Sequence, residues 1–376
     1  MKIKRSLLAL VSLTILATFA PAICAQGSTW DPHHTWVFMV GMVEWKDKES
    51  FDSFPADNRK DLVLLDTFKK RGVPNSQIVY LADKAAPTAV VEQRFTDFLK
   101  RPGPNDWIIV YFEGHGYKTD DTNIPYLATY DVDDNILGWK FRSIPDNIDK
   151  FFRGDHAMIM LDDCYSGSMA GAVKAVKRRV SFAVFASSAA SKESTGNWTF
   201  TEALINGFDG TSYADLNHDG VITLREMADN AQQDMLFGEE QISTTAFTGD
   251  FDPNTVIATS QRPATPRIGQ RVEAYSTSDS DWYRGFIVAD RGTEAKVHYY
   301  GYEKADEEWI ANNHIRVPHS DSPFKVGDRV EISYKNQWYK GRVLDIKGGS
   351  HYVSYDGYDT DENEWVPTKR IRKLTK

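Results

Sequence analysis

The sequence predicts an α/β domain with a mostly parallel sheet and helices on both faces, followed by two small β-barrels. Up to about residue 260, apolar runs typical of strands alternate with segments of helical spacing, the pattern that builds parallel sheets. Residues 261–266 contain Pro263 and Pro266 and are predicted to be a linker. Beyond them one sequence pattern occurs twice, which indicates a duplicated small domain.

Residues 28–260 are expected to form the α/β domain. The apolar runs 37–43, 78–81, 107–112, 157–161 and 180–186 are predicted strands, because they are short, rich in β-formers and bounded by Gly or charge. Residues 57–70, 89–99 and 200–208 have apolar residues at helical spacing, and a further helix is predicted to begin near Thr223. Gly72 and Pro74 end the first of these helices.

The duplicated region is predicted to form two small SH3-like barrels, barrel 1 at residues 267–318 and barrel 2 at 324–374. The motif WYRG at 282–285 returns as WYKG at 338–341, and YYGY at 299–302 returns as YDGY at 355–358. The motif EWI at 308–310 likewise returns as EWV at 364–366. Each copy contains about five short strand-like runs separated by turn signals, which is typical of a small β-barrel.

The first 25 residues have the features of a secretory signal peptide. Lys2, Lys4 and Arg5 precede an apolar stretch at 7–20, and the tripeptide APA at 20–22 or ICA at 23–25 offers a cleavage site. The apolar stretch is too short to span a bilayer comfortably, so we expect export to the periplasm or the extracellular space without membrane insertion. Cleavage after Ala25 would remove Cys24 and leave Cys164 as the sole thiol.

The charge of the chain does not favour nucleic acid as a partner. The formal charge is −9, and loss of the three signal-peptide cations would make it −12. Residues 267–376 hold 18 basic and 18 acidic residues, so the duplicated region is neutral. Binding to a phosphate backbone needs an excess of Lys and Arg, which neither part provides.

A histidine and a cysteine follow two of the predicted strands. The run 107–112 is followed by Glu113, Gly114 and His115, and the run 157–161 leads through two aspartates to Cys164. The carboxyl ends of parallel strands meet at one edge of the sheet, so we expect these side chains on the same rim. A thiol beside an imidazole indicates a nucleophile with its general base, and the alternative is a small buried side chain at a strand end.

These motifs resemble those of caspase-like cysteine peptidases, nearer the metacaspase type than the animal caspases. The resemblance covers about residues 33–260 and rests on YFEGHG at 111–116, LDDCYSG at 161–167, FASS at 185–188 and FTEAL at 200–204. It implies a caspase fold in which His115 and Cys164 cleave peptide bonds through a thioester. It also implies an oxyanion hole formed by the backbone N–H groups of Gly116 and Cys164. Tyr165 departs from the histidine usual there and is expected to adjust the rim.

The same resemblance implies a preference for Arg or Lys before the cleaved bond. Metacaspases carry an acid two residues before the cysteine, here Asp162, that lines the primary specificity pocket. Glu44 or Asp47, after the first strand, is a candidate second acid of that pocket. The alternative is that Asp162 or Asp163 caps a turn.

Residues 215–226 match a calcium-binding loop. The pattern places oxygen donors at loop positions 1, 3 and 5, a glycine at 6, a backbone carbonyl at 7 and a glutamate at 12. We expect a structural Ca²⁺ and no organic cofactor, with a metal-free turn as the alternative. The predicted ligands are Asp215, Asn217, Asp219, Val221 and Glu226.

The two barrels resemble Tudor and chromo-barrel domains, in which an aromatic cage can hold a methylated ammonium group by cation–π attraction. The alternative, which we favour from sequence alone, is that most of the aromatic residues fill the small barrel cores. The candidates are Tyr275, Trp282, Tyr302, Trp309, Tyr334, Trp338, Tyr358 and Trp365.

Together these features predict an exported cysteine endopeptidase that acts on protein or peptide substrates. Its barrels would form a docking module for an unknown ligand. The alternative is a catalytically silent caspase-like scaffold that acts through the barrels. The presence of both His115 and Cys164 favours the enzyme.

Overall fold

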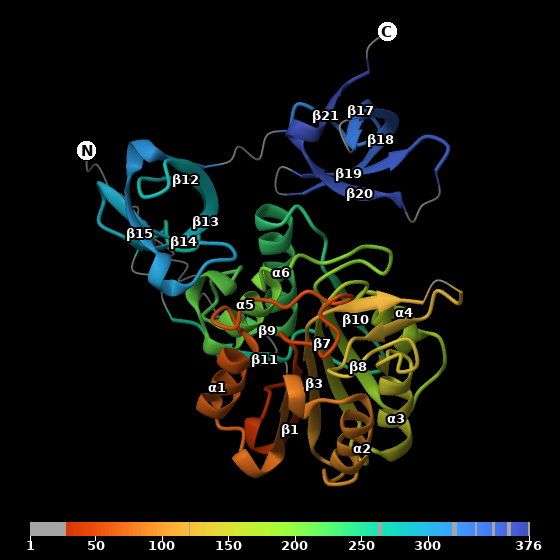
Figure 1. The fold of residues 1–376 in the computed structure, drawn as a ribbon. Helices are drawn as coiled ribbons and strands as arrows, with labels where there is room; N and C mark the ends of the chain where they lie inside the picture. Colours follow the sequence, from red (N-terminus) through yellow and green to blue (C-terminus); the bar gives the residue numbers. More distant parts are fainter. Residues whose placement is uncertain are drawn as a thin grey trace, which may run out of the picture.

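The computed structural model describes residues 28–119, 121–261, 265–317, 322–334, 337–347, 350–358 and 362–374. An α/β domain comes first along the chain, and two small antiparallel sheets follow it (Figure 1). The predicted signal peptide and residues 262–264 of the predicted linker lie outside the described residues.

The α/β domain is built around a six-stranded sheet with the order β10-β8-β7-β3-β1-β2. All neighbouring pairs from β8 to β2 are parallel, and β10 joins the edge antiparallel to β8. The predicted parallel sheet is therefore confirmed, and the antiparallel edge strand is an addition to it. The strands are β1 Thr35–Gly41, β2 Ile78–Ala82, β3 Trp107–Glu113, β7 His156–Asp162, β8 Ser181–Ala186 and β10 Thr244–Phe247.

Helices cover both faces of this sheet (Figure 1). On one face α2, α3 and α4 pack over a core that contains Phe38, Phe95 and Phe98. On the other face α1, α5 and α6 pack over a core that contains Phe68 and Phe208. The helices are α1 Asp61–Arg71, α2 Thr88–Leu99, α3 Ser143–Phe151, α4 Ser168–Lys174, α5 Thr199–Asp209 and α6 Leu224–Gly238.

Two short sheets flank the main one. The first has the order β4-β5-β6 and follows the histidine, and the second pairs β9 with β11 next to the predicted calcium loop. These strands were not expected from the sequence, since runs of two to four residues carry too little periodicity. They are β4 Gly116–Lys118, β5 Pro125–Leu127, β6 Trp139–Lys140, β9 Val221–Thr223 and β11 Val256–Thr259.

The register between β3 and β7 positions the candidate site. Glu113 lies opposite Asp162 at the ends of these strands, and the N–H of Gly114 donates to the Asp162 carbonyl at 3.2 Å. His115 and Cys164 each follow two residues later, so both leave the carboxyl edge of the sheet from neighbouring strands.

Each C-terminal repeat forms a five-stranded antiparallel sheet, in agreement with the predicted pair of small SH3-like barrels. The strand orders correspond, and each sheet has a register shift at the same place, at Ile287/Ala289 and at Val343/Asp345. Barrel 1 contains β12 Arg271–Ser276, β13 Asp281–Asp290, β14 Glu294–Tyr299, β15 Glu308–Ala311 and β16 Ile315–Arg316. Barrel 2 contains β17 Arg329–Tyr334, β18 Gln337–Lys347, β19 Ser350–Tyr355, β20 Glu364–Pro367 and β21 Ile371–Lys373.

Barrel 1 rests on α5 and α6 through buried polar contacts. The Asp234 carboxylate accepts hydrogen bonds from Arg271 at 2.9 Å and from the Tyr300 hydroxyl at 2.7 Å. His298 of the barrel lies 2.9 Å from Glu202 of α5. Barrel 2 reaches the α/β domain through side chains such as Lys369, which pairs with Glu240 at 3.0 Å.

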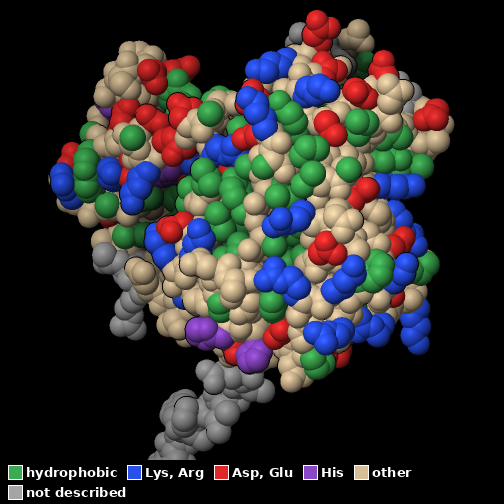
Figure 2. Space-filling view, turned by 60° about the horizontal axis from the view of Figure 1, so that its bottom comes forward, with side chains coloured by type: hydrophobic (Ala, Val, Ile, Leu, Met, Phe, Trp, Pro, Cys, Tyr) green, Lys and Arg blue, Asp and Glu red, His purple; other side chains and the backbone are tan. Residues whose placement is uncertain are grey.

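No helix in the described residues is long and apolar enough to cross a membrane. On the face drawn in Figure 2, Lys and Arg side chains are scattered among acidic and neutral ones and do not merge into one continuous basic surface. This distribution agrees with the charge balance, which does not favour nucleic acid.

Candidate functional site

His115 is held at the sheet edge by an aromatic loop. We call residues 44–58 the histidine loop; its Phe54 ring centroid lies 4.6 Å from that of His115, and Trp45 lies at 4.5 Å. Burial among these rings lowers the pKa of His115. The imidazole Nε2 lies 2.8 Å from the backbone carbonyl oxygen of Asp52.

The contact with Asp52 determines which nitrogen of His115 can act as a base. A carbonyl oxygen can only accept a hydrogen bond, so Nε2 carries the hydrogen in this contact. The neutral ring then has its free electron pair on Nδ1. The lowered pKa favours this neutral form at pH 7, as a general base requires.

Cys164 lies under a second loop, residues 187–197, which we call the cysteine loop. Its Sγ accepts the N–H of Ser194 at 3.2 Å and lies 3.7 Å from the Ser194 carbonyl oxygen. Burial raises the pKa of Cys164 to about 11, although the hydrogen bond from Ser194 acts in the opposite direction. The cysteine is therefore a thiol in this conformation, and it needs a neighbouring base to react.

Gly116 lies against the backbone of Cys164. A Cβ at position 116 would come 2.2 Å from the Cys164 carbonyl oxygen and 2.5 Å from Asp163 Oδ1. The two strand-end segments are thus in direct contact, and only glycine fits between them. This proximity is compatible with the predicted oxyanion hole.

Asp162 is buried beneath the rim and joins a chain of hydrogen bonds. Its Oδ2 accepts the N–H of Thr201 at 3.1 Å and the Thr201 hydroxyl at 2.7 Å. The hydroxyl of Thr201 lies 2.8 Å from that of Tyr111, which donates to Glu113 at 2.6 Å. Burial raises the pKa of Asp162 to about 6, while the bonds from Thr201 lower it. Asp162 therefore caps the first turn of α5, and its predicted contact with substrate remains a prediction.

Asp163 has a different environment from Asp162. Its side chain is buried, and neither carboxylate oxygen has a hydrogen-bond partner among the described residues. Burial, together with the charge of Asp162, raises the pKa of Asp163 well above its usual range. Because its carboxylate accepts no hydrogen bond from the described residues, Asp163 does not cap a turn, and burial without a partner favours its neutral form.

The two other acids proposed for the pocket lie in the histidine loop. Glu44 pairs with Lys48 at 3.3 Å, and Asp47 accepts the N–H groups of Glu49 and Ser50 at 3.0 and 3.2 Å. Both acids therefore shape the loop that covers His115.

An arginine near the same edge, with a side chain 12% exposed, was not predicted from the sequence. Arg59 donates to the Asp61 carboxylate at 2.7 Å and to the Gly41 carbonyl at 3.0 Å, and it also pairs with Asp83. Asp83 in turn accepts the N–H of Val43 at 2.9 Å. Charged residues far apart in the sequence give no periodic signal, so only the fold reveals this cluster.

The predicted calcium loop folds around its own acceptors. Asp215 accepts the N–H groups of Asp219 and Gly220 at 3.2 and 3.1 Å, and Glu226 Oε1 accepts the N–H of Asn217 at 3.3 Å. The other oxygen of Glu226 caps α6 in a capping box with Thr223. In the described part of the chain, no three His, Cys, Asp or Glu side chains form a ready metal cluster. A calcium site here would therefore also need the side-chain oxygen of Asn217 and the backbone carbonyl oxygen of Val221 as ligands.

We expect Ca²⁺ to raise the melting temperature of the protein. A ligand that binds only the folded state stabilises it by mass action, by about 2.7 kcal/mol at a hundred times its Kd. Glu226→Gln removes a charged donor but keeps the shape of the side chain, so it should abolish most of the shift. The measurement is a thermal melt from chelator to millimolar Ca²⁺, with Mg²⁺ as the control. An unchanged melting temperature would contradict the site.

Each barrel carries a pocket lined by tyrosines and acids, and three of the tyrosines correspond between the two barrels. In barrel 1 the ring centroids of Tyr283, Tyr299 and Tyr302 lie 5.5 to 6.2 Å apart. This pocket, cage 1, has a volume of about 180 Å³ and is lined by Ser276, Ser278, Asp279, Tyr283, Tyr299, Tyr302, Asp306 and Glu308.

The corresponding pocket of barrel 2 is built from the matching residues of the repeat. The ring centroids of Tyr339, Tyr355 and Tyr358 lie 6.0 to 6.1 Å apart. This pocket, cage 2, has a volume of about 90 Å³ and is lined by Lys192, Tyr334, Tyr339, Tyr355, Tyr358, Glu362 and Glu364.

The expectation that the barrel aromatics fill the cores is wrong for most of them. The barrel cores are mainly aliphatic, and small side chains such as Val272, Ala274 and Val343 occupy them. Among the candidates, Trp365 is buried, Tyr275 packs edge-on against Trp282, and Tyr302, Tyr334 and Tyr358 line the cages. The remaining tryptophans stack under arginines: Trp282 under Arg316, Trp309 under Arg291 and Trp338 under Arg372.

Comparison with known families identifies the C-terminal region. Residues 269–320 and 327–375 both match the Agenet domain family. The duplicated region therefore consists of two Agenet domains, which have the Tudor-like architecture. The match covers well under half of the chain. No curated protein matches the chain.

Three solved structures are similar to parts of the chain. A protein from Geobacter sulfurreducens is 16% identical over 62% of this chain and 98% of its own, with a TM-score of 0.45. AGDP1 of Arabidopsis thaliana is 23% identical over 28% of this chain and 80% of its own, with a TM-score of 0.14. The tandem Agenet domains 3–4 of ADCP1 are 23% identical over 28% of this chain and 79% of that one, with a TM-score of 0.13.

Proposed function

We propose that this protein is a caspase-like cysteine endopeptidase whose two Agenet domains bind a partner. The observation that supports catalysis is the position of His115, whose Nε2 is tied to the Asp52 carbonyl at the sheet edge that also carries Cys164. That contact leaves Nδ1 as the basic nitrogen. The match to Agenet domains supports the binding role more directly than the catalytic one.

The proposed reaction follows from these side chains. His115 Nδ1 takes the proton from Cys164 Sγ, and the thiolate attacks the peptide carbonyl carbon. The N–H groups of Gly116 and Cys164 stabilise the resulting oxyanion. The C–N bond then breaks, the amine leaves with the proton from His115, and a thioester remains. Water, deprotonated by His115, attacks the thioester and releases the acid and the thiol.

We propose that the substrates carry Arg or Lys before the cleaved bond, with Asp162 as the main pocket acid. A buried carboxylate with no cation beside it is costly, and a substrate cation would offset that cost. The net negative charge of the chain also attracts cationic substrates at long range. Glu44 and Asp47 are nearer the surface and would add to this attraction.

For the barrels we propose a ligand with an ammonium group. Cage 1 combines three tyrosine rings with the carboxylates of Asp279, Asp306 and Glu308, and both kinds of group attract a cation. If the predicted signal peptide directs export, this ligand belongs to a protein outside the cytoplasm.

A peptide chloromethyl ketone distinguishes the peptidase from a catalytically silent scaffold. An arginyl ketone should alkylate Cys164 much faster than iodoacetamide does at the same concentration, because a working site orients the ketone. Peptide mass spectrometry locates the label at Cys164 and separates it from Cys24. Equal rates for the two reagents would support the scaffold.

Removal of a cage tyrosine should weaken binding of a lysine-containing peptide to barrel 1. The cation–π contribution of one ring is about 1–2 kcal/mol in a partly closed site, so Tyr302→Ala should raise the Kd about five- to thirtyfold. Tyr275→Ala is the matched control, because Tyr275 lies in the same barrel but outside cage 1. Titration of trimethyllysine and unmodified lysine peptides gives the preferred methylation state. Equal Kd values for the two variants would contradict the cage.

A further inference from the structure

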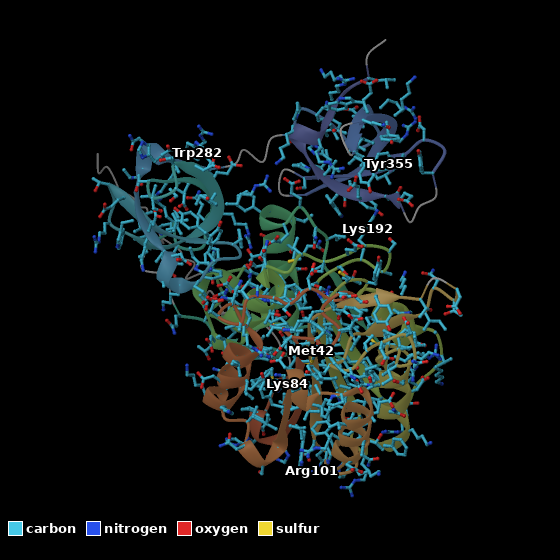
Figure 3. The ribbon with its side chains drawn as sticks, in the orientation of Figure 1. Met42, Lys84, Arg101, Lys192, Trp282 and Tyr355 are labelled. Atoms are coloured by element: carbon cyan, nitrogen blue, oxygen red, sulfur yellow. The ribbon has the colours of Figure 1, made fainter. Side chains whose placement is uncertain are left out.

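Cage 2 holds a lysine of the α/β domain at its edge. Lys192 is among the residues that line the cage, and its Nζ lies 3.8 Å from Glu362 Oε2. The Lys192 side chain retains 35% of its exposure, so it is at the mouth of the cage and not deeply enclosed. Figure 3 shows Lys192 on the upper edge of the α/β domain, directly below Tyr355.

The two cages differ in this contact although their walls correspond. Cage 1 is lined by tyrosines, serines and acids, and no Lys or Arg is among its lining residues. The two cages are formed by matching tyrosines and acids in the two copies of the repeat. The walls of cage 2 therefore suit a cation as those of cage 1 do. The placement of barrel 2 over the α/β domain brings Lys192 to this cage.

Lys192 belongs to the cysteine loop that covers the thiol. Its carbonyl oxygen accepts the N–H of Tyr165 at 2.8 Å, next to Cys164 in the chain. Two residues further on, Ser194 contacts the Sγ of Cys164 with both its N–H and its carbonyl oxygen. A short segment therefore connects cage 2 to the candidate nucleophile.

We propose that Lys192 is an internal ligand of cage 2, and that this contact holds the cysteine loop over Cys164. A partner that presents an ammonium side chain to cage 2 competes with Lys192, releases the loop and uncovers the thiol. This inference rests on the proposed function in taking Cys164 as the nucleophile and the cages as sites for an ammonium group.

The geometry suits an exchange of ligands. The cage has room for one ammonium group, since its volume is about 90 Å³. The ion pair with Glu362 is long and partly exposed, so solvent screens it and an external cation can displace Lys192. Part of the intrinsic affinity of a partner is used to displace the internal ligand.

The test measures the rate at which iodoacetamide alkylates Cys164 in the full chain, followed by peptide mass spectrometry. Lys192→Gln removes the ammonium group, and Tyr358→Ala opens the cage at a residue that is 57% exposed and lies outside the barrel core. Each variant should react about five- to tenfold faster than the parent, as expected when one weak contact of the ammonium group with the cage is lost. The double variant should react no faster than the single ones.

Two control variants separate this contact from general effects. Val326→Ala trims an exposed side chain of barrel 2 outside cage 2, and Lys84→Gln removes an exposed lysine of the α/β domain; both should react at the parental rate. Unchanged or slower alkylation in both Lys192→Gln and Tyr358→Ala would overturn the inference, as would additive effects in the double variant. If the predicted pattern is found in a protein that cleaves no peptide, the coupling stands and the proposed peptidase function fails.

Discussion

Replacing Cys164 with Ala should lower peptidase activity on the order of a thousandfold or more while the protein stays folded. The substitution removes the atom that forms the thioester, and no other thiol lies in the described residues. Alanine is tolerated structurally because the thiol contacts only the backbone of Ser194 in the hydrogen bonds it makes. The measurement is turnover of a fluorogenic arginyl peptide, with circular dichroism as the check on folding.

His115→Ala should cost nearly as much, because the nucleophile and its base act as one unit. For the same reason the double variant should be scarcely worse than either single variant. His33→Ala is a matched control, since His33 is an exposed histidine outside the site. Full turnover by Cys164→Ala would end the cysteine-peptidase hypothesis and leave the scaffold.

The five parallel strands of the main sheet were predictable from the sequence, because buried parallel strands are apolar runs with clear ends. The placement of His115 and Cys164 on one edge follows from that pattern, since a parallel register aligns the residues just past two neighbouring strands. The partner of His115 was not predictable. Asp52 lies in an irregular loop whose path depends on the packing of Phe54 and Trp45 on the imidazole.

Aromatic residues of the barrels line the cages because the barrel cores have little room for them. The barrel sheets bury alternate residues, and in β12 those positions hold Val272 and Ala274, so the core is already filled by small side chains. The tyrosines that wall cage 1 come from different strands and turns, and only the folded sheet brings them together. Trp365 is the exception, because it is buried.

Asp162 likewise combines a predictable position with an unpredictable environment. Its place at the end of β7 follows from the sequence pattern, whereas its bond to Thr201 joins residues 39 positions apart. A contact between residues so far apart in the sequence depends on how α5 packs against the sheet. Periodicity carries no information about it.

Asp162→Asn should reduce cleavage of arginyl peptides by about thirtyfold or more. Breaking a desolvated charge pair by removing one partner costs about 2–5 kcal/mol. Asparagine keeps an oxygen that can accept the hydrogen bonds of Thr201, so the cap on α5 should survive the change. Asp163→Asn is the control, because Asp163 is equally buried but its carboxylate has no hydrogen-bond partner among the described residues, so the change should not alter selectivity.

The pH dependence gives a second measure of the same carboxylate. The pKa of Asp162 is raised to about 6, so the group is ionised at pH 7.5 and becomes neutral as the pH falls below 6. The ratio of kcat/KM for an arginyl peptide to that for a matched glutaminyl peptide should therefore fall through this range. The ratio cancels the titration of His115 and Cys164, which both substrates share. In Asp162→Asn the ratio should be low and independent of pH. A preference for an aspartyl peptide, or undiminished arginyl cleavage by Asp162→Asn, would refute this specificity.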